Sequence, residues 1–149
     1  MPIASYLDAS VLIAALTGKG PAAVKAYDVM NDPNRRFVSS DYLRLEVICK
    51  PTFNRRTESL EVYQEFFSSA KHTPNNDEVV GRAVNLGCAH DIEPLDALHV
   101  SASISGKAAE FITAEKPSKP LFRATGLGPK LISIYTPEVG EPLMERHPK

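Results

Sequence analysis

The sequence predicts an α/β domain with a mainly parallel central sheet and helices on both faces. Short apolar or β-leaning runs alternate along the chain with longer segments whose apolar residues recur at helical spacing. Such alternation is typical of parallel strands joined by helical crossovers. Acidic residues also follow these runs where strands would end, which is the sheet edge at which α/β domains bind ligands.

The N-terminal segment predicts a strand and two helices. Ile3 to Leu7 suits a buried strand, and Asp8 or Ser10 can cap the helix that follows. A second helix is expected over 21–32, because Pro21 suits a first helical position. The expected apolar face of this second helix is Ala23, Val24, Tyr27 and Met30.

A second strand and a third helix are expected next. The segment 35–40 leans towards β structure. Ser39 or Ser40 can then cap a helix over 41–50, and Pro51 is expected to end it. The expected apolar face of this helix is Tyr42, Leu45, Ile48 and Cys49.

Three more helices are expected before the chain returns to the sheet. Thr57 can cap the first of them, and the second covers about 77–90. The third runs from Leu95 to about Ser105, and we expect it to be largely buried because apolar residues surround most of it. The apolar residues assigned to the first two are Leu60, Tyr63, Phe66, Phe67 and Ala70, then Val80, Ala83, Val84 and Cys88.

The C-terminal part predicts two strands and a tail. The segments 108–113 and 131–135 suit strands, and a loop rich in Pro, Gly and Lys joins them, with room for a short strand. We therefore predict one domain over 1–135 and a mobile tail over 136–149, which has few apolar residues.

Composition gives little direct information about partners. With 17 basic and 18 acidic residues the net charge is −1, so no basic field indicates nucleic-acid binding. If four of the acids bind cations, the other charged residues together carry a net positive charge. The composition is therefore also compatible with a polyanionic substrate. Cys49 and Cys88 suit small core residues of a reducing compartment. With no basic leader and no run of roughly 18 apolar residues, we expect a cytoplasmic protein without membrane contact.

Four acids are placed beside apolar segments and not in solvated charge clusters: Asp8, Glu46, Asp96 and Glu115. Carboxylates brought together repel, so such a group either keeps a proton or binds a hard cation such as Mg²⁺ or Mn²⁺. Two such ions, about 3.5–4 Å apart, activate a water and stabilise the leaving oxygen in phosphoryl displacement. The sequence therefore predicts one shared metal site. Each acid also has a simpler explanation as a helix cap or surface charge.

The motifs resemble a known family. Four segments occur in the same order, and at roughly the same intervals, as the acidic motifs of the PIN-domain ribonucleases, and within that family of the VapC-type toxins of toxin–antitoxin pairs. They are YLDASVLI, SSDYLRLEV, PLDALHVSAS and FITAEK. The resemblance implies a PIN-like three-layer α/β/α fold. It also implies an endoribonuclease that depends on Mg²⁺ or Mn²⁺, leaves 5′-phosphate and 3′-hydroxyl ends, and is held inactive by a cognate antitoxin protein. Family members commonly form a homodimer.

The resemblance assigns roles to single residues. Asp8, Glu46, Asp96 and Glu115 correspond to the catalytic and metal-binding acids, although the family usually has Asp at the last position. Ser10 and Thr113 are candidates to hold the carboxylates or a metal-bound water. We interpret His99 as structural. Cations near the acids in sequence are candidates to contact single-stranded or looped RNA, namely Arg35, Arg36, Arg55, Arg56, Lys116 and Lys119, with Lys50 and Arg123.

Two other functions remain open. A catalytically weak PIN-like module that only binds RNA or a partner would account for Glu115 and the near-neutral charge. A phosphatase or phosphoacceptor would use Asp8 as a nucleophile. The phosphatase pattern wants a second Asp two residues later, where this chain has Ser10.

Overall fold

The computed structural model describes residues 1–137, and the predicted tail lies outside the described residues from 138 onward. Five strands form one sheet in the order β3-β2-β1-β4-β5. Every strand pair in it is parallel. The strands are β1 (Ile3–Leu7), β2 (Arg35–Ser40), β3 (Lys71–Thr73), β4 (Glu110–Thr113) and β5 (Lys130–Ser133). The predicted parallel α/β architecture is confirmed.

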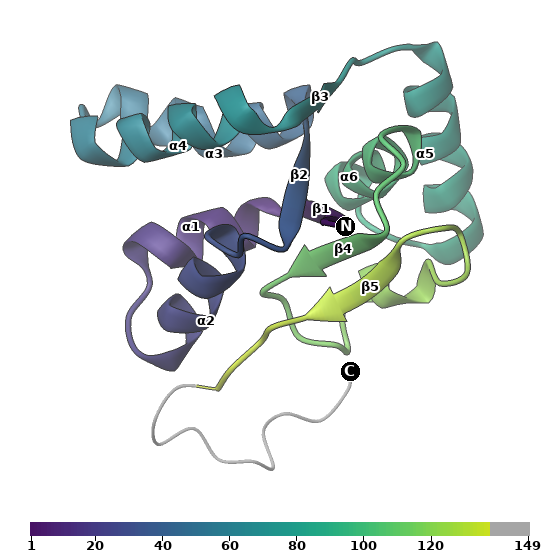
Figure 1. Ribbon diagram of the computed structural model, residues 1–149. Coiled ribbons are helices and arrows are strands. Elements are labelled where there is room, and N and C mark those ends of the chain that lie inside the picture. Colours follow the sequence, from purple (N-terminus) through teal and green to yellow (C-terminus); the bar gives the residue numbers. More distant parts are fainter. Residues whose placement is uncertain (138–149) are drawn as a thin grey trace.

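Six α-helices connect the strands in pairs. Helices α1 (Ala9–Thr17) and α2 (Pro21–Met30) lead from β1 to β2, and α3 (Asp41–Phe53) and α4 (Thr57–Ser69) lead on to β3. The third pair is α5 (Asp77–His90) and α6 (Pro94–Ser105), which precedes β4. Figure 1 shows α1 to α4 on one side of the sheet and α5 with α6 on the other. A short 3₁₀ helix (Pro120–Arg123) lies in the loop before β5.

The order of the strands determines where a site can form. The chain adds β2 and then β3 on one side of β1, and afterwards crosses to place β4 and β5 on the other side. The connections therefore reverse direction between β1 and β4, which is the position where open parallel sheets hold their ligands. Leu7 pairs with Ile112 at the carboxyl ends of these two strands.

The core packs against both faces of the sheet. Tyr6, Leu7 and Phe111 on the central strands are almost completely buried, and Tyr6 stacks on Phe111 with ring centroids 5.3 Å apart. Helix α6 is the most enclosed of the helices, as expected from its sequence; its buried residues are Ala97, His99, Val100, Ser101, Ala102 and Ser103.

The apolar faces of three helices differ from the prediction. Helix α2 buries Ala26 and Met30 but exposes Val24 and Tyr27. The buried residues of α3 are Leu43 and Val47, and those of α5 are Val79, Ala83 and Leu86. These helices carry apolar residues on more than one face, and packing against the sheet selects only one of them. Both cysteines consequently lie on the exposed side, so the prediction that they are core residues is wrong.

Some element boundaries also differ. Helix α3 continues past Pro51 to Phe53, because the proline sits in its final turn, where the amide of Asn54 still donates to the carbonyl of Lys50. Arg56, and not Thr57, precedes α4 as its capping residue. Strand β3 was not predicted, since three residues at a sheet edge give no periodic pattern. Within residues 1–137, no helix combines the length and the apolar character that a membrane crossing needs.

Candidate metal centre at the carboxyl edge of the sheet

Asp8 occupies the junction between β1 and α1. Its Oδ1 accepts the backbone N–H of Ala9 at 2.8 Å, so the side chain caps the helix. Its Oδ2 accepts two hydroxyl groups, that of Ser10 at 3.1 Å and that of Thr113 at 2.9 Å. The side chain is only 6% exposed. These three donors hold the buried carboxylate in one orientation at the edge of the sheet.

Ser10 and Thr113 are themselves fixed by the backbone around β4. The Ser10 Oγ accepts the amide of Ala114 at 3.0 Å, and the Thr113 Oγ1 accepts that of Glu115 at 3.1 Å. The two hydroxyl oxygens lie 3.2 Å apart. The two residues predicted to orient the acids therefore both contact Asp8, and their part in catalysis stays a prediction.

Glu46 and His99 complete a cluster with Asp8. One ligand atom from each of the three residues lies within 4.8 Å of the other two. Glu46 comes from α3 and His99 from α6, so three separate segments converge at this point. The His99 Nε2 is hydrogen-bonded to Glu46 Oε1. His99 is fully buried, whereas the Glu46 side chain remains 32% exposed.

The other ring nitrogen of His99 faces the core. His99 Nδ1 lies 2.6 Å from the hydroxyl of Tyr6, which in turn lies 2.6 Å from the hydroxyl of Ser40. Ser40 caps α3 by accepting the amide of Leu43 at 3.2 Å. Burial, followed by the negative charges of Asp8 and Glu46, raises the pKa of Tyr6 well above its ordinary value, although the hydrogen bond between Tyr6 and Ser40 opposes the rise.

Asp96 lies in the first turn of α6 and is half-buried. Burial first, and then the negative charges of Asp8, Glu93 and Glu115, raise the pKa of its carboxyl to about 6, while His99 opposes them. This electrostatic coupling joins Asp96 to the same charged region as Asp8.

Glu115 follows β4, and its side chain is more exposed than that of Glu46. Its side chain is 46% exposed, and its Oε2 lies 3.7 Å from the Nζ of Lys119. It is close enough to Asp96 to influence that carboxyl. The structure therefore brings the four acids to one edge of the sheet, with Asp8 and Glu46 in the tight cluster and Glu115 at the margin.

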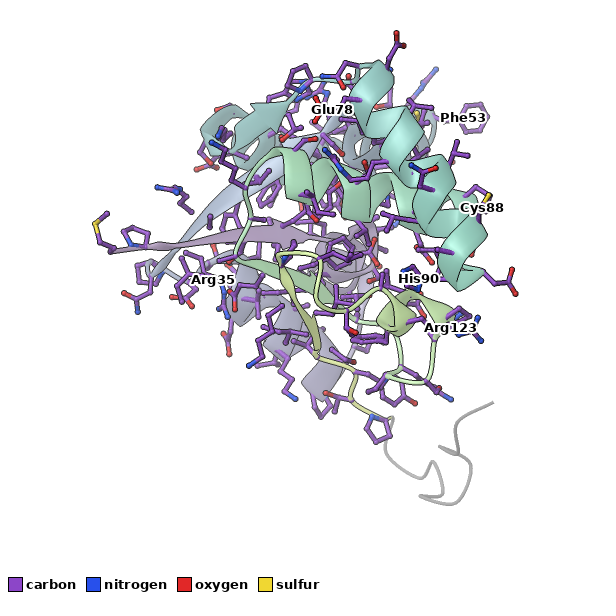
Figure 2. All side chains as sticks on the ribbon, turned by 90° about the vertical axis from the view of Figure 1, so that its right-hand side faces the viewer. Arg35, Phe53, Glu78, Cys88, His90 and Arg123 are labelled. Carbon is purple, nitrogen blue, oxygen red and sulfur yellow. The ribbon has the colours of Figure 1, made fainter. Side chains whose placement is uncertain are left out.

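The predicted RNA-contacting cations do not all lie near this edge. Arg35 and Arg36 begin β2, at the opposite end of the parallel strands. Arg35 is paired there with Asp32 at 2.6 Å and Glu110 at 2.8 Å. Figure 2 shows Arg35 on the side of the molecule opposite His90 and Arg123. Strand direction therefore carries Arg35 and Arg36 away from the acids, and their contact with RNA stays a prediction.

The other candidate cations are closer to the acids. A cavity of about 320 Å³ opens beside Glu46 between α1, α3 and α4, and Lys50 and Arg56 line it. Its remaining lining residues are Ile13, Thr17, Val47, Pro51, Asn54, Ser59 and Tyr63. Arg55 adjoins it in the turn between α3 and α4, with a left-handed backbone (φ 54°).

The remaining loop cations have internal contacts. Lys116 lies over the ring of Tyr135, with its Nζ 5.4 Å from the centroid, and Lys119 pairs with Glu115. The Arg123 guanidinium donates to the carbonyl of His90 at 3.1 Å. Arg123 therefore joins the loop before β5 to the end of α5.

Sequence reasoning missed Tyr6 and Ser40 as part of the site and treated His99 as structural. Tyr6 resembles an ordinary strand residue, and Ser40 was recognised only as a helix cap. The hydrogen bond between Tyr6 and His99 joins residues 93 positions apart, which no local pattern can indicate. The sequence signal that points to His99 is its position one turn after Asp96, on a helix whose other polar residues are serines.

Comparison with known proteins agrees with this geometry. A chain of a toxin–antitoxin complex from Klebsiella pneumoniae superposes with a TM-score of 0.67 at 14% identity, over 89% of this chain and 99% of that one. A chain of VapBC2 from Rickettsia felis, solved bound to a DNA fragment from its promoter, gives a TM-score of 0.63 at 12% identity, over 87% and 97%. At such identities the likeness establishes the fold. A search of curated proteins gives no match. The PIN domain model matches residues 5–116, most of the chain and all four acids, and the chain therefore belongs to the PIN domain family.

Proposed function

We propose that the protein is an endoribonuclease that depends on Mg²⁺ or Mn²⁺ and serves as the toxin of a type II toxin–antitoxin pair. The observation that carries the proposal is the convergence of Asp8 and Glu46, with Asp96 electrostatically coupled to Asp8, at the carboxyl edge of β1 and β4. Membership of the PIN domain family, whose members are generally nucleases, agrees with it.

The residues present fit a divalent ion. Carboxylate oxygens are the ligands that Mg²⁺ and Mn²⁺ prefer. Burial, and then the neighbouring acids, raise the pKa of Asp96, and a cation bound beside it would favour the ionised carboxylate. Asp8, Glu46 and Asp96 would hold the ion, and Glu115 would contribute from the margin. When bound, such ions activate a water and stabilise the leaving oxygen of a phosphodiester.

The protein's own groups prepare this edge for the reaction. Ser10 and Thr113 keep the Asp8 carboxylate oriented through two hydroxyl donors. Lys50 and Arg56 supply positive charge beside Glu46, where they would bind the phosphates of single-stranded RNA that enters the cavity. No side-chain nucleophile is required for this chemistry.

Cleavage of RNA by two matched variants tests the proposal. We expect the wild-type protein to cut RNA with Mg²⁺ or Mn²⁺ and to stop when EDTA is added. Asp8→Asn should abolish cleavage and leave the circular dichroism spectrum unchanged. Glu78→Gln, which removes an exposed carboxylate paired with Arg82 on α5, is the control and should retain full activity. Equal cleavage by Asp8→Asn, or cleavage that persists in EDTA, would refute the assignment.

A weaker, purely binding function is the second candidate. The pairing of Glu115 with Lys119 at 3.7 Å favours it, because an acid paired with lysine is less available to a metal ion. A gel assay with added metal, run alongside a Mn²⁺ titration, separates the two functions. RNA binding without turnover would support the binding module, whereas clear cleavage would exclude it.

The proposal includes a cognate antitoxin protein and a homodimer. The similar folds come from toxin–antitoxin complexes. Val24 and Tyr27 are more than half exposed on α2 and would suit a surface covered by a partner. Co-expression with a small reading frame beside the gene should give a stable complex without ribonuclease activity. Light scattering on the chain alone should give a dimer mass, and a monomer would contradict that part of the proposal.

A further inference from the structure

We propose that His99 is a positioning residue, whose Nε2–H holds the Glu46 carboxylate beside Asp8, and that it is not itself a metal ligand. The inference rests on the proposed function, in which Glu46 helps to hold the ion. It is carried by a continuous chain of hydrogen bonds that starts at the amide of Leu43 and ends at Glu46.

The chain of hydrogen bonds is shielded from water. Ser40, Tyr6 and His99 are all fully buried. Water therefore does not compete for these hydrogens, and the protein alone decides which atom donates in each contact. A buried polar hydrogen left without an acceptor keeps the full cost of its desolvation, so the arrangement that pairs all of them is favoured.

One orientation pairs every hydrogen. The Ser40 Oγ already accepts the amide of Leu43, so its own hydrogen can go to the Tyr6 oxygen. The Tyr6 hydroxyl then donates to His99 Nδ1. A neutral ring that accepts at Nδ1 carries its hydrogen on Nε2, and this hydrogen points at the Glu46 carboxylate.

The reverse orientation leaves groups unsatisfied. If His99 Nδ1 donated to Tyr6 and Tyr6 to Ser40, the Ser40 hydrogen would have no acceptor among the contacts recorded for residues 1–137. In a neutral ring, Nε2 would then present a lone pair to the Glu46 carboxylate, and two acceptors would face each other. A metal ion that used Nε2 requires this same unfavourable orientation.

In this orientation the Tyr6 oxygen accepts the hydrogen of Ser40, and its own hydrogen is directed at His99 Nδ1. With Nε2 occupied by hydrogen, the imidazole contributes orientation and no metal bond. Asp8 receives its orientation from hydroxyl groups and Glu46 from an imidazole, so each carboxylate of the cluster has its own support.

Nitrogen NMR on the metal-free, full-length protein tests the tautomer without reference to activity. The ¹⁵N signals of His99, assigned by their loss in His99→Gln, should show hydrogen on Nε2 and a bare Nδ1. In Tyr6→Phe, which removes the donor to Nδ1, this preference should weaken. A ring with hydrogen on Nδ1 in the wild-type protein would overturn the inference. This result stands even if the protein cuts no RNA, in which case only the proposed function fails.

Mn²⁺ binding tests the positioning role. His99→Leu should weaken Mn²⁺ affinity and kcat by 10–100-fold, the usual effect of losing a group that orients a ligand. His99→Gln keeps an N–H close to the position of Nε2 and should recover most of both. Tyr6→Phe should fall between them. Ser101→Ala is the matched control, because it removes a fully buried hydroxyl on α6 that donates to the carbonyl of Val79 at 2.6 Å, away from the site.

Two outcomes would overturn the role of His99. In pulsed EPR of the Mn²⁺ complex we expect no nitrogen bound directly to the ion, and a coupling typical of a ligated imidazole would make His99 a ligand. Likewise, if Tyr6→Phe and His99→Leu matched Ser101→Ala in Mn²⁺ affinity, the chain of hydrogen bonds would be merely structural.

Discussion

Replacing Asp96 by Asn should stabilise the metal-free protein at neutral pH while it removes activity. The pKa of Asp96 rises from 3.8 to about 6 in the folded state, through burial first and then through neighbouring acids. Between these two values the folded state keeps a proton that the unfolded chain releases. Stability of the metal-free protein therefore falls as pH rises from about 4 to about 6 and then levels off, because above pH 6 both states are ionised.

The size of the effect follows from the shift in pKa. A rise from 3.8 to about 6 corresponds to about 3 kcal/mol for a group shielded from water. Asp96 is only half-buried, so solvent screening reduces this to about 1.5 kcal/mol. Asn also loses the favourable charge at the start of α6, worth about 0.5 kcal/mol. The net gain should be about 1 kcal/mol, or about 2–4 °C in Tm.

Urea unfolding of both proteins at about pH 5 and about pH 7.5, in EDTA, measures this difference. The gain in unfolding free energy from Asp96→Asn should be clearly larger at the higher pH, since at pH 5 only part of the destabilisation caused by ionising Asp96 is present. Asp28→Asn, on the exposed face of α2, should show no such pH dependence. Added Mn²⁺ should stabilise the wild-type protein and have little effect on Asp96→Asn. An Asn variant that is less stable than wild type at pH 7.5 would refute this account of the carboxyl.

Three further outcomes are expected. Thr113→Val removes the hydroxyl that donates to Asp8 at 2.9 Å, and should lower kcat by 10–100-fold with a loss of about 1 kcal/mol in stability; unchanged kinetics would contradict its orienting role. Arg35→Ala should lower Tm by breaking the pairs with Asp32 and Glu110 but leave RNA affinity unchanged in filter binding. Lys50→Gln and Arg56→Gln should each weaken the binding of a short single-stranded RNA, measured in the Asp8→Asn background. Each should also reduce the slope of log affinity against log salt concentration by about 1. An unaltered slope would mean that the RNA binds elsewhere.

The α/β class and the parallel strand arrangement could be predicted from the sequence because their signals are local, whereas the order of the strands was not predicted. Each of the four longer strands is a short apolar or β-leaning run, and three of the four crossovers contain α-helices with caps or breakers such as Pro21 and Ser40. The acids Asp8 and Glu115 could be placed at one edge for the same reason, since carboxyl ends of parallel strands meet there. The edge strand Lys71–Thr73 has no such signal and was missed.

The faces of the helices were harder to predict. Leu45 and Val84 look as apolar as Leu43 and Val79, yet the first pair is exposed and the second is buried. Only the position of the sheet and of neighbouring helices decides which side is covered. The same limit applies to the cations: Arg35 lies near the acids in sequence terms, but the direction of β2 places it at the far end of the strands.

The central place of β1 has a consequence for synthesis of the protein. The hydrogen bond from Thr113 to Asp8 joins residues 105 positions apart, and β1 acquires its second neighbour only when β4 docks. A nascent chain still short of β4 has an open sheet edge beside Asp8 and lacks one of the two hydroxyls that bind its Oδ2. Under the proposed function, the nascent chain would therefore be unable to attack RNA until β4 has been made and has docked beside β1.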